Sequence, residues 1–421
     1  MSTVHVIGAG LAGLAAALSL AEAGRHVVIH ESAPAAGGRC RSYFDRGLGL
    51  RIDNGNHLLL SGNHATMGFL DQIGARHGLS GPGVAAFPFL DLASGESWVL
   101  RPSRGRLPWW MFARDRRVPG TRLRDYLALL RLLRVRDEVT VQALLDDSRL
   151  YERLVKPVAV SALNTQPEVA LATLLGAVLR ETLMKGAASC VPSFPRLGLS
   201  ACFIDPALEW LRARGAVVGF GRRVAALHHE GLRVTALESG GGRVALAASD
   251  QVVLAVPPFV AGELLPGLLV PDAFEAILNV HFRLDEAAMA DRTLFGAGGF
   301  LGLVGGMAEW VFLKPEVAAV TISAANALVD RDAEEIAATV WPEVRRALRL
   351  PPATLPPPVR VVKERRATLA ATAAQERRRP PARTGLANLA LAGDWTATGL
   401  PATIEGAIRS GRTAAATLLA A

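Results

Sequence analysis

Cysteine is scarce in this 421-residue sequence, and its three cysteines, Cys40, Cys190 and Cys202, lie far apart. No Cys-x-x-Cys or neighbouring histidine pair accompanies them, which argues against a disulfide framework and a metal site and suits a reducing compartment. No window of about 18 uninterrupted apolar residues occurs, so we expect no membrane-spanning helix. A charged n-region followed by an apolar h-region is also absent, so we expect no signal peptide and a cytoplasmic location.

Acidic residues are outnumbered by basic ones, which gives a formal net charge of +8. The basic residues concentrate in residues 101–136, 345–349, 363–366 and 377–383. Interleaved stacking aromatics, a helix-turn-helix pattern and a zinc pattern are missing there, so we expect no nucleic-acid partner. A solvated basic face is the simplest interpretation, followed by peripheral docking on an anionic membrane and then by an acidic protein partner.

A Gly-x-Gly-x-x-Gly motif joins a short β-branched strand, residues 4–7, to an Ala/Leu-rich helix that we predict to end near residue 23. Gly8 permits the tight turn, Gly10 lets backbone approach a pyrophosphate, and Gly13 lets the helix pack closely on the strand. The helix N-terminus then presents unpaired N–H groups to the phosphates. This arrangement predicts a Rossmann-like dinucleotide-binding unit.

The second predicted strand, residues 26–30, ends at Glu31. A carboxylate there can accept hydrogen bonds from a ribose 2′-OH, which favours an unphosphorylated ribose over NADP. Residues 37–41, Gly-Gly-Arg-Cys-Arg, form either a phosphate-side loop with charge from Arg39 or Arg41, or an ordinary glycine turn with solvated arginines.

Two further segments combine polar residues with neighbouring apolar runs. Residues 52–60 place Asp53, two asparagines and His57 around Gly55, as at a ligand-facing turn. We favour a buried, hydrogen-bonded role for His57, and a role as an acid or ligand-binding group is the alternative. Near the C-terminus, a predicted strand ends at Gly393-Asp394, where a carboxylate suits a ribityl or ribose hydroxyl. Thr403 can then cap an Ala-rich helix.

The middle of the chain predicts an inserted substrate-binding region. Residues 85–100 show a strand pattern, and residues 215–256 show several short strands. Residues 266–350 mix strands with one helix, residues 332–348, and a proline-rich linker follows at residues 351–358. Helical patterns dominate residues 121–183. The first of these helices is basic, and its leucines are expected to cover a core: Leu123, Leu127, Leu130 and Leu133. We also expect the aromatics of residues 109–112 to pack in a core, and a pocket wall or a membrane contact is the alternative.

Five segments carry a resemblance to a known family. They are residues 36–42 (AGGRCRS), 52–63 (IDNGNHLLLSGN), 150–165 (LYERLVKPVAVSALNT), 392–396 (AGDWT) and 399–411 (GLPATIEGAIRSG). The chain resembles the FAD-dependent amine oxidase and phytoene desaturase superfamily and, within it, the bacterial hydroxysqualene dehydroxylases of hopanoid synthesis. The resemblance implies an α/β fold of the GR2 flavoprotein type, a Rossmann-like FAD-binding domain with an inserted substrate domain of mixed sheet and helical cap.

The resemblance implies that the FAD-binding domain comprises residues 1–84, 201–265 and 359–421, and the substrate domain residues 85–200 and 266–358. It implies cofactor-binding roles for Gly8, Gly10, Leu11, Ala12, Gly13, Glu31, Ser32, Gly38, Arg39, Asn54, Gly55, Asn56, His57, Val224, Gly393, Asp394, Pro401, Thr403, Ile404 and Ala407. Because the C-terminal flavin segment has no cysteine or histidine, we expect FAD to be bound noncovalently.

The activity that the resemblance implies is reductive removal of the allylic hydroxyl of hydroxysqualene, a long apolar isoprenoid, to give squalene. An acid must protonate the departing hydroxyl, and Asp53, His57 and Glu405 are the candidates. The reductant of the flavin is not identified by the sequence. The alternatives are a carotenoid-type desaturase running in the oxidative direction and a flavin-free prenyl-lipid escort protein.

Overall fold

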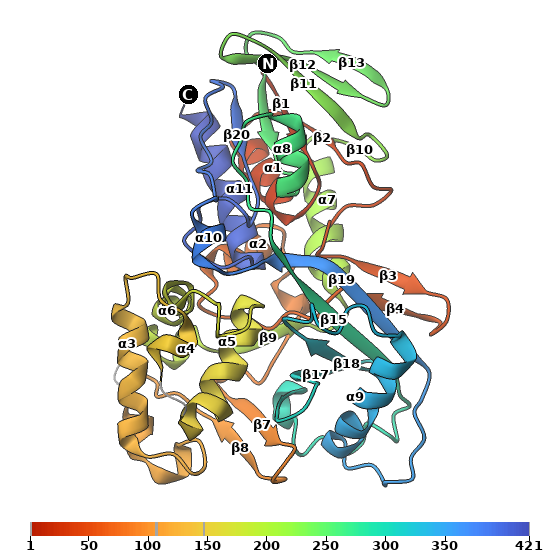
Figure 1. The fold of residues 1–421 in the computed structure, drawn as a ribbon. Coiled ribbons are helices and arrows are strands. Elements are labelled where there is room, and N and C mark those ends of the chain that lie inside the picture. Colours follow the sequence, from red (N-terminus) through yellow and green to blue (C-terminus); the bar gives the residue numbers. More distant parts are fainter. Residues whose placement is uncertain (1, 106–107, 146–147, 421) are drawn as a thin grey trace.

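The computed structural model describes residues 2–105, 108–145 and 148–420. In Figure 1 both chain ends lie in the upper half of the molecule, which is built on a five-stranded parallel sheet in the order β10-β2-β1-β14-β20. The strands are β1 (Thr3–Ile7), β2 (His26–His30), β10 (Val217–Gly219), β14 (Gln251–Leu254) and β20 (Leu389–Leu391). The beginning, middle and end of the chain therefore meet in one sheet.

The helices of this half pack around that sheet. They are α1 (Leu11–Glu22), α2 (His64–Gln72), α7 (Asp205–Arg212), α8 (Pro258–Leu264), α10 (Ala373–Glu376) and α11 (Ile404–Leu419). Their small residues let α1 and α11 come close together. A Cβ added to Gly411 would lie 2.1 Å from the Ala12 carbonyl oxygen, so α11 needs glycine at that position.

An antiparallel sheet of β11 (Val224–Glu230), β12 (Arg233–Ser239) and β13 (Gly242–Ala245) lies at the top of Figure 1. Two small sheets lie elsewhere: β3 (Ser42–Asp45) with β4 (Leu50–Asp53), and β9 (Pro192–Pro195) between β5 (Leu59–Leu60) and β6 (Leu79–Ser80).

The lower half contains a seven-stranded mixed sheet in the order β19-β15-β18-β17-β16-β7-β8. Its strands are β7 (Phe87–Asp91), β8 (Ser97–Leu100), β15 (Phe274–Arg283), β16 (Phe300–Val304), β17 (Trp310–Lys314), β18 (Val317–Ile322) and β19 (Val359–Leu369). Helix α9 (Ala333–Ala347) packs Trp341 against Phe282 of β15. Strand β19 was not predicted, and its pairing with β15 extends this sheet past the predicted boundary at residue 358.

The helical cap lies beside the seven-stranded sheet and consists of α3 (Leu129–Arg134), α4 (Val141–Leu144), α5 (Lys156–Leu163) and α6 (Ala172–Glu181) with several one-turn helices. The leucine stripe predicted to cover a core is wrong in part. Leu123, Leu127 and Leu130 are exposed and Leu133 is half-buried, whereas Leu132, outside the predicted stripe, is buried. The stripe fails because the chain forms a 3₁₀-helix over Leu123–Ala128 and α3 is only six residues long, so side chains spaced for one α-helix do not share a face.

The aromatic stretch before α3 also divides. Trp110 is buried against Tyr126, as predicted, whereas Trp109 and Phe112 are exposed.

The three cysteines are free thiols. Within the described ranges, no helix combines the length and apolar character needed to cross a bilayer.

Candidate active site

The three glycines after β1 have different surroundings. A Cβ added to Gly8 would lie 2.5 Å from the Ala255 carbonyl oxygen, and one added to Gly13 would lie 2.0 Å from the Gly8 oxygen. A Cβ added to Gly10 would meet nothing within 4 Å. Gly10 begins α1 without a side-chain cap, so the first N–H groups of the helix face open space and can bind an anion. This loop fits the pyrophosphate of a dinucleotide.

Glu31 lies at the carboxyl end of β2, beside the glycine loop. Its Oε2 accepts a hydrogen bond from the Ala9 N–H at 2.7 Å, and its Oε1 accepts one from the Ser32 hydroxyl at 3.3 Å. The Glu31 carbonyl oxygen accepts the Arg222 N–H at 2.8 Å, which brings the nearby Val224 to the same edge of the sheet. The residues expected around the adenosine are thus close together.

Arg39 and Asp394, which are 355 residues apart in the chain, form an ion pair in which one guanidinium nitrogen lies 2.7 Å from each carboxylate oxygen. Gly37 forms a β-bridge with Gly10, and a Cβ added to Gly38 would lie 3.5 Å from the Gly10 Cα. The phosphate-side loop therefore lies against the glycine motif, and Arg39 joins that loop to the C-terminal Gly-Asp segment.

The C-terminal helix begins as the sequence predicts. The Thr403 hydroxyl accepts a hydrogen bond from the Gly406 N–H at 3.1 Å, which caps α11. The Gly393 N–H donates to the Ser410 hydroxyl at 2.9 Å, so the Gly-Asp turn is held against the first turns of that helix.

Arg379 is a site residue that sequence reasoning missed. Within the basic stretch 377–383 it is almost completely buried, with 2% of its side chain exposed. Its guanidinium donates to the carbonyl oxygens of Thr396, Leu400 and Asp394 at 2.9, 2.7 and 3.0 Å. The interpretation of this stretch as a solvated face is wrong for Arg379, which holds the turn between β20 and α11.

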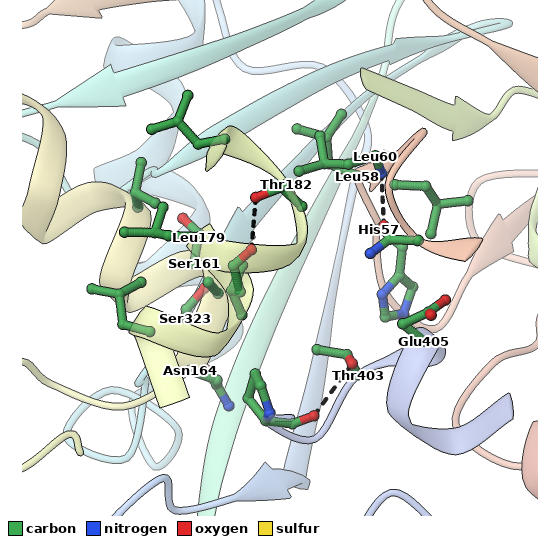
Figure 2. A pocket seen from close by; sticks show the side chains of 18 of the residues that line it. His57, Leu58, Leu60, Ser161, Asn164, Leu179, Thr182, Ser323, Thr403 and Glu405 are labelled. Carbon is green, nitrogen blue, oxygen red and sulfur yellow. Dashed lines mark hydrogen bonds between the residues drawn. The ribbon is translucent and has the colours of Figure 1, made fainter. Parts of the chain in front are cut away.

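A largely apolar cavity of about 360 Å³ lies between the C-terminal segment and the helical cap. One side of the cavity is formed by residues 56–60 and 400–405, and the opposite side by residues of α3, α5 and α6. Figure 2 shows His57, Thr403 and Glu405 on one side of the cavity, with Ser161 and Leu179 facing them across it. The aromatic rings of Phe87, Phe89, Trp310 and Phe312 belong to the sheet that forms a further part of the wall.

Asp53, one of the three candidate acids, is buried and is not among the residues that line this cavity. It accepts hydrogen bonds from Lys314 Nζ at 2.6 Å, the Ser42 hydroxyl at 2.5 Å and the Leu199 N–H at 2.8 Å. Burial opposes its ionisation, but the Lys314 ammonium and these hydrogen bonds lower the pKa of Asp53 below its ordinary value. Asp53 is therefore a carboxylate at neutral pH.

Glu405 lines the cavity, but its oxygens already accept several hydrogen bonds. They accept the N–H groups of Ala65 and Thr66 at 3.0 and 2.8 Å, which satisfies the N-terminus of α2. Arg409 pairs with Glu405 at 3.0 Å and also with Glu181 of the helical cap at 2.7 Å. All these partners are donors, so the carboxyl group of Glu405 joins α2 to α11, and Arg409 links it to the cap.

His57 lines the cavity next to the flavin segment. Burial lowers its pKa to about 4, so its imidazole is neutral at pH 7. Glu309, which the sequence did not single out, is also half-buried, and desolvation raises its pKa to about 7. Glu309 accepts the backbone N–H of Ser323 at 3.0 Å, and Ser323 lines the cavity.

Comparison with known proteins matches residues 11–419 to the model of the flavin-containing amine oxidoreductases. The chain is 49% identical to the hydroxysqualene dehydroxylase of Rhodopseudomonas palustris, over all of this chain and 99% of the relative. It is 44% identical to that of Zymomonas mobilis, over 99% of this chain and 98% of the relative. The chain belongs to the hydroxysqualene dehydroxylase family. This is the family whose resemblance the five sequence segments carry.

The fold is found in solved structures with little sequence similarity. An oxidoreductase from Methanosarcina mazei superposes with a TM-score of 0.69 at 16% identity, covering 97% of this chain and 98% of that one. The expected architecture, a Rossmann-like flavoprotein with an inserted domain of mixed sheet and helices, is confirmed. At this identity the likeness concerns the fold alone.

Proposed function

We propose that this chain binds FAD noncovalently and removes the allylic hydroxyl of hydroxysqualene to give squalene. The observation that carries the proposal is an apolar cavity lined by residues 400–405 of the C-terminal segment, in a chain whose family members share its full length. Removing the surface of an elongated hydrocarbon from water stabilises it by about 25 cal/mol per Å². The cavity wall supplies that environment over most of its surface.

The residues around the two chain ends fit FAD. Gly10 and the N-terminus of α1 would hold the pyrophosphate, Glu31 and Val224 the adenosine, and Asp394 the ribityl chain. The capped N-terminus of α11 would face the isoalloxazine. Of the remaining expected cofactor contacts, Asn54 and Gly55 lie in the same turn as His57, Ile404 and Ala407 lie in the first turn of α11, and Pro401 lines the cavity.

When bound, reduced FAD supplies the hydride that replaces the hydroxyl, and a two-electron donor restores it between turnovers. The hydroxyl leaves as water once it has received a proton. Carbon–oxygen cleavage at an allylic carbon leaves a delocalised cation, which an apolar wall shields from solvent. The aromatic rings of the wall can stabilise this positive charge.

His57 is the acid that the geometry favours among the three candidates, because Asp53 does not line the cavity and the oxygens of Glu405 already accept hydrogen bonds from other donors. Neutral at rest, it must take up a proton before it delivers one to the hydroxyl. Among the charges that act on His57, Asp53 favours the protonated imidazole, whereas Lys314 and Arg39 oppose it. We assign Asp53 and Glu405 to positioning: Asp53 anchors the turn that carries His57, and Glu405 joins the cap to α11.

The experiment that tests this function uses anaerobic, pre-reduced holoprotein incubated with hydroxysqualene, with the product identified by mass spectrometry. Squalene formation is expected. Oxidised holoprotein incubated with phytoene or squalene is the comparison, and new double bonds there would instead indicate a desaturase. Purified protein without flavin absorbance would favour a lipid escort.

The substrate proposal has a consequence for location. A C30 isoprenoid partitions into lipid, so we place the protein in the cytoplasm with peripheral contact to the membrane that supplies it.

A further inference from the structure

One segment of the helical cap accounts for the positive charge of the whole chain. Residues 101–136 contain eleven arginines and two aspartates, a net charge of +9, whereas the chain as a whole carries +8. The remaining 385 residues are therefore close to neutral. Arg114, Arg116 and Arg134 are among the exposed arginines of this segment; Arg106 and Leu107 lie outside the described residues.

The same segment exposes large apolar side chains between its arginines. Trp109, Phe112 and Leu127 have 64%, 58% and 62% of their surface exposed, and Leu123 and Leu130 are exposed as well. Trp109 and Phe112 contact each other, with ring centroids 5.8 Å apart. A solvated basic face has no need of such side chains, and a site for double-stranded nucleic acid would not gather them.

This surface lies on the outer side of the cavity wall. Leu129 and Leu132 of α3 line the cavity, while Leu127 and Leu130 of the same stretch are exposed. Pro102, near the start of the segment, also lines the cavity. In Figure 1 α3 is at the outer edge of the lower half, far from β11–β13 at the opposite end.

We infer that residues 101–105 and 108–136 form a docking surface for an anionic lipid bilayer, with the apolar cavity immediately behind it. The arginines attract acidic headgroups, and Trp109, Phe112 and Leu127 enter the interfacial region. The identity of the substrate rests on the proposed function, whereas the docking surface rests on charge and exposure alone. Docked this way, the protein receives its substrate at the cap and keeps the FAD-binding half in water.

The charge part of the inference is tested by cosedimentation of the FAD-loaded protein with phosphatidylcholine vesicles, with and without phosphatidylglycerol. The wild type binds the anionic vesicles and binds the neutral ones weakly. The variant R114Q/R116Q/R134Q partitions on the order of a hundredfold more weakly, since each basic residue near an anionic surface contributes about a factor of five. A control with the same loss of charge on the FAD-binding half keeps wild-type binding: R212Q/R223Q/R243Q.

The apolar part is tested by W109S/F112S/L127S, which is expected to lower binding while leaving its salt dependence intact. The matched control replaces exposed leucines outside the segment and binds like the wild type: L232S/L269S/L355S. Equal binding by the two segment variants and the wild type overturns the inference. So does salt-independent binding, or a change of oligomeric state in the segment variants without vesicle binding, which would make the surface a contact between copies.

Turnover of detergent-dispersed hydroxysqualene separates the two proposals. The docking variants are expected to keep wild-type turnover in detergent and to lose it with vesicle-embedded substrate. A wild type that is inactive in detergent refutes the proposed function but leaves vesicle binding to decide the docking surface. A wild type that is active in detergent yet does not bind vesicles refutes the docking surface alone.

Discussion

Replacing Lys314 with methionine leaves the Asp53 carboxylate without its cation in a buried environment. In the wild type the two groups are 2.6 Å apart, with 12% and 2% of their side chains exposed. Breaking a buried pair by removing one partner costs about 3–5 kcal/mol. The Ser42 hydroxyl and the Leu199 N–H still solvate Asp53, so we expect a value near the lower end, about 3 kcal/mol.

Thermal unfolding of the apoprotein provides the assay. With an unfolding entropy of about 2.1 cal/mol/K per residue, a chain of 421 residues that unfolds as one unit loses about 3–4 °C of Tm for this change. The double variant Lys314→Met with Asp53→Asn removes the unpaired charge, and it is expected to recover part of that loss.

The effect of pH on the Tm difference between Lys314→Met and the wild type has a definite sign. In the wild type the pKa of Asp53 is lowered, so its ion pair stabilises the fold above the ordinary carboxyl pKa and is lost as pH falls through the lower folded value. Without Lys314, burial favours the protonated acid, so the difference in Tm between variant and wild type should shrink on acidification from pH 7 to pH 5. A Tm difference below 1 °C at pH 7, or one that grows on acidification, would refute the reasoning.

Three further predictions concern the cofactor and the proton. Gly10→Ala should fold normally but bind FAD poorly, whereas Gly13→Ala should unfold at lower temperature, because only its Cβ would collide with backbone; equal FAD titrations for Gly10→Ala and wild type contradict this. Arg379→Met should weaken FAD retention on gel filtration by freeing the turn before α11, and unchanged retention would remove its positioning role. If His57 delivers the proton, kcat/KM should rise about tenfold per pH unit from pH 7 to 5, and His57→Gln should flatten the profile; a plateau below pH 7 would point to Glu309 instead.

The sequence was most informative where local chemistry determines local structure. The glycine spacing, the acid after the second strand and the threonine before the last helix each predicted a feature that depends on a few neighbouring residues. The strand before Gly8, the helix from Leu11 and the cap at Thr403 are confirmed for that reason.

Features that depend on distant partners were not accessible in the same way. Arg39 and Asp394 were both named, but their ion pair follows from the meeting of the two chain ends. Arg379 looked like one more charge in a basic run, and its burial depends on three carbonyl groups of a turn that follows it. Leu127 fitted a helical stripe, yet a 3₁₀ segment turned it outward.

The central claim is that the two chain ends hold one flavin against a cavity for an allylic alcohol. Its most direct test is a single turnover in which anaerobic, reduced holoprotein is mixed with hydroxysqualene while flavin absorbance and squalene are followed together. We predict that one squalene forms for each flavin oxidised, at the same rate. Flavin oxidation without squalene, or squalene formation without flavin oxidation, would contradict the account.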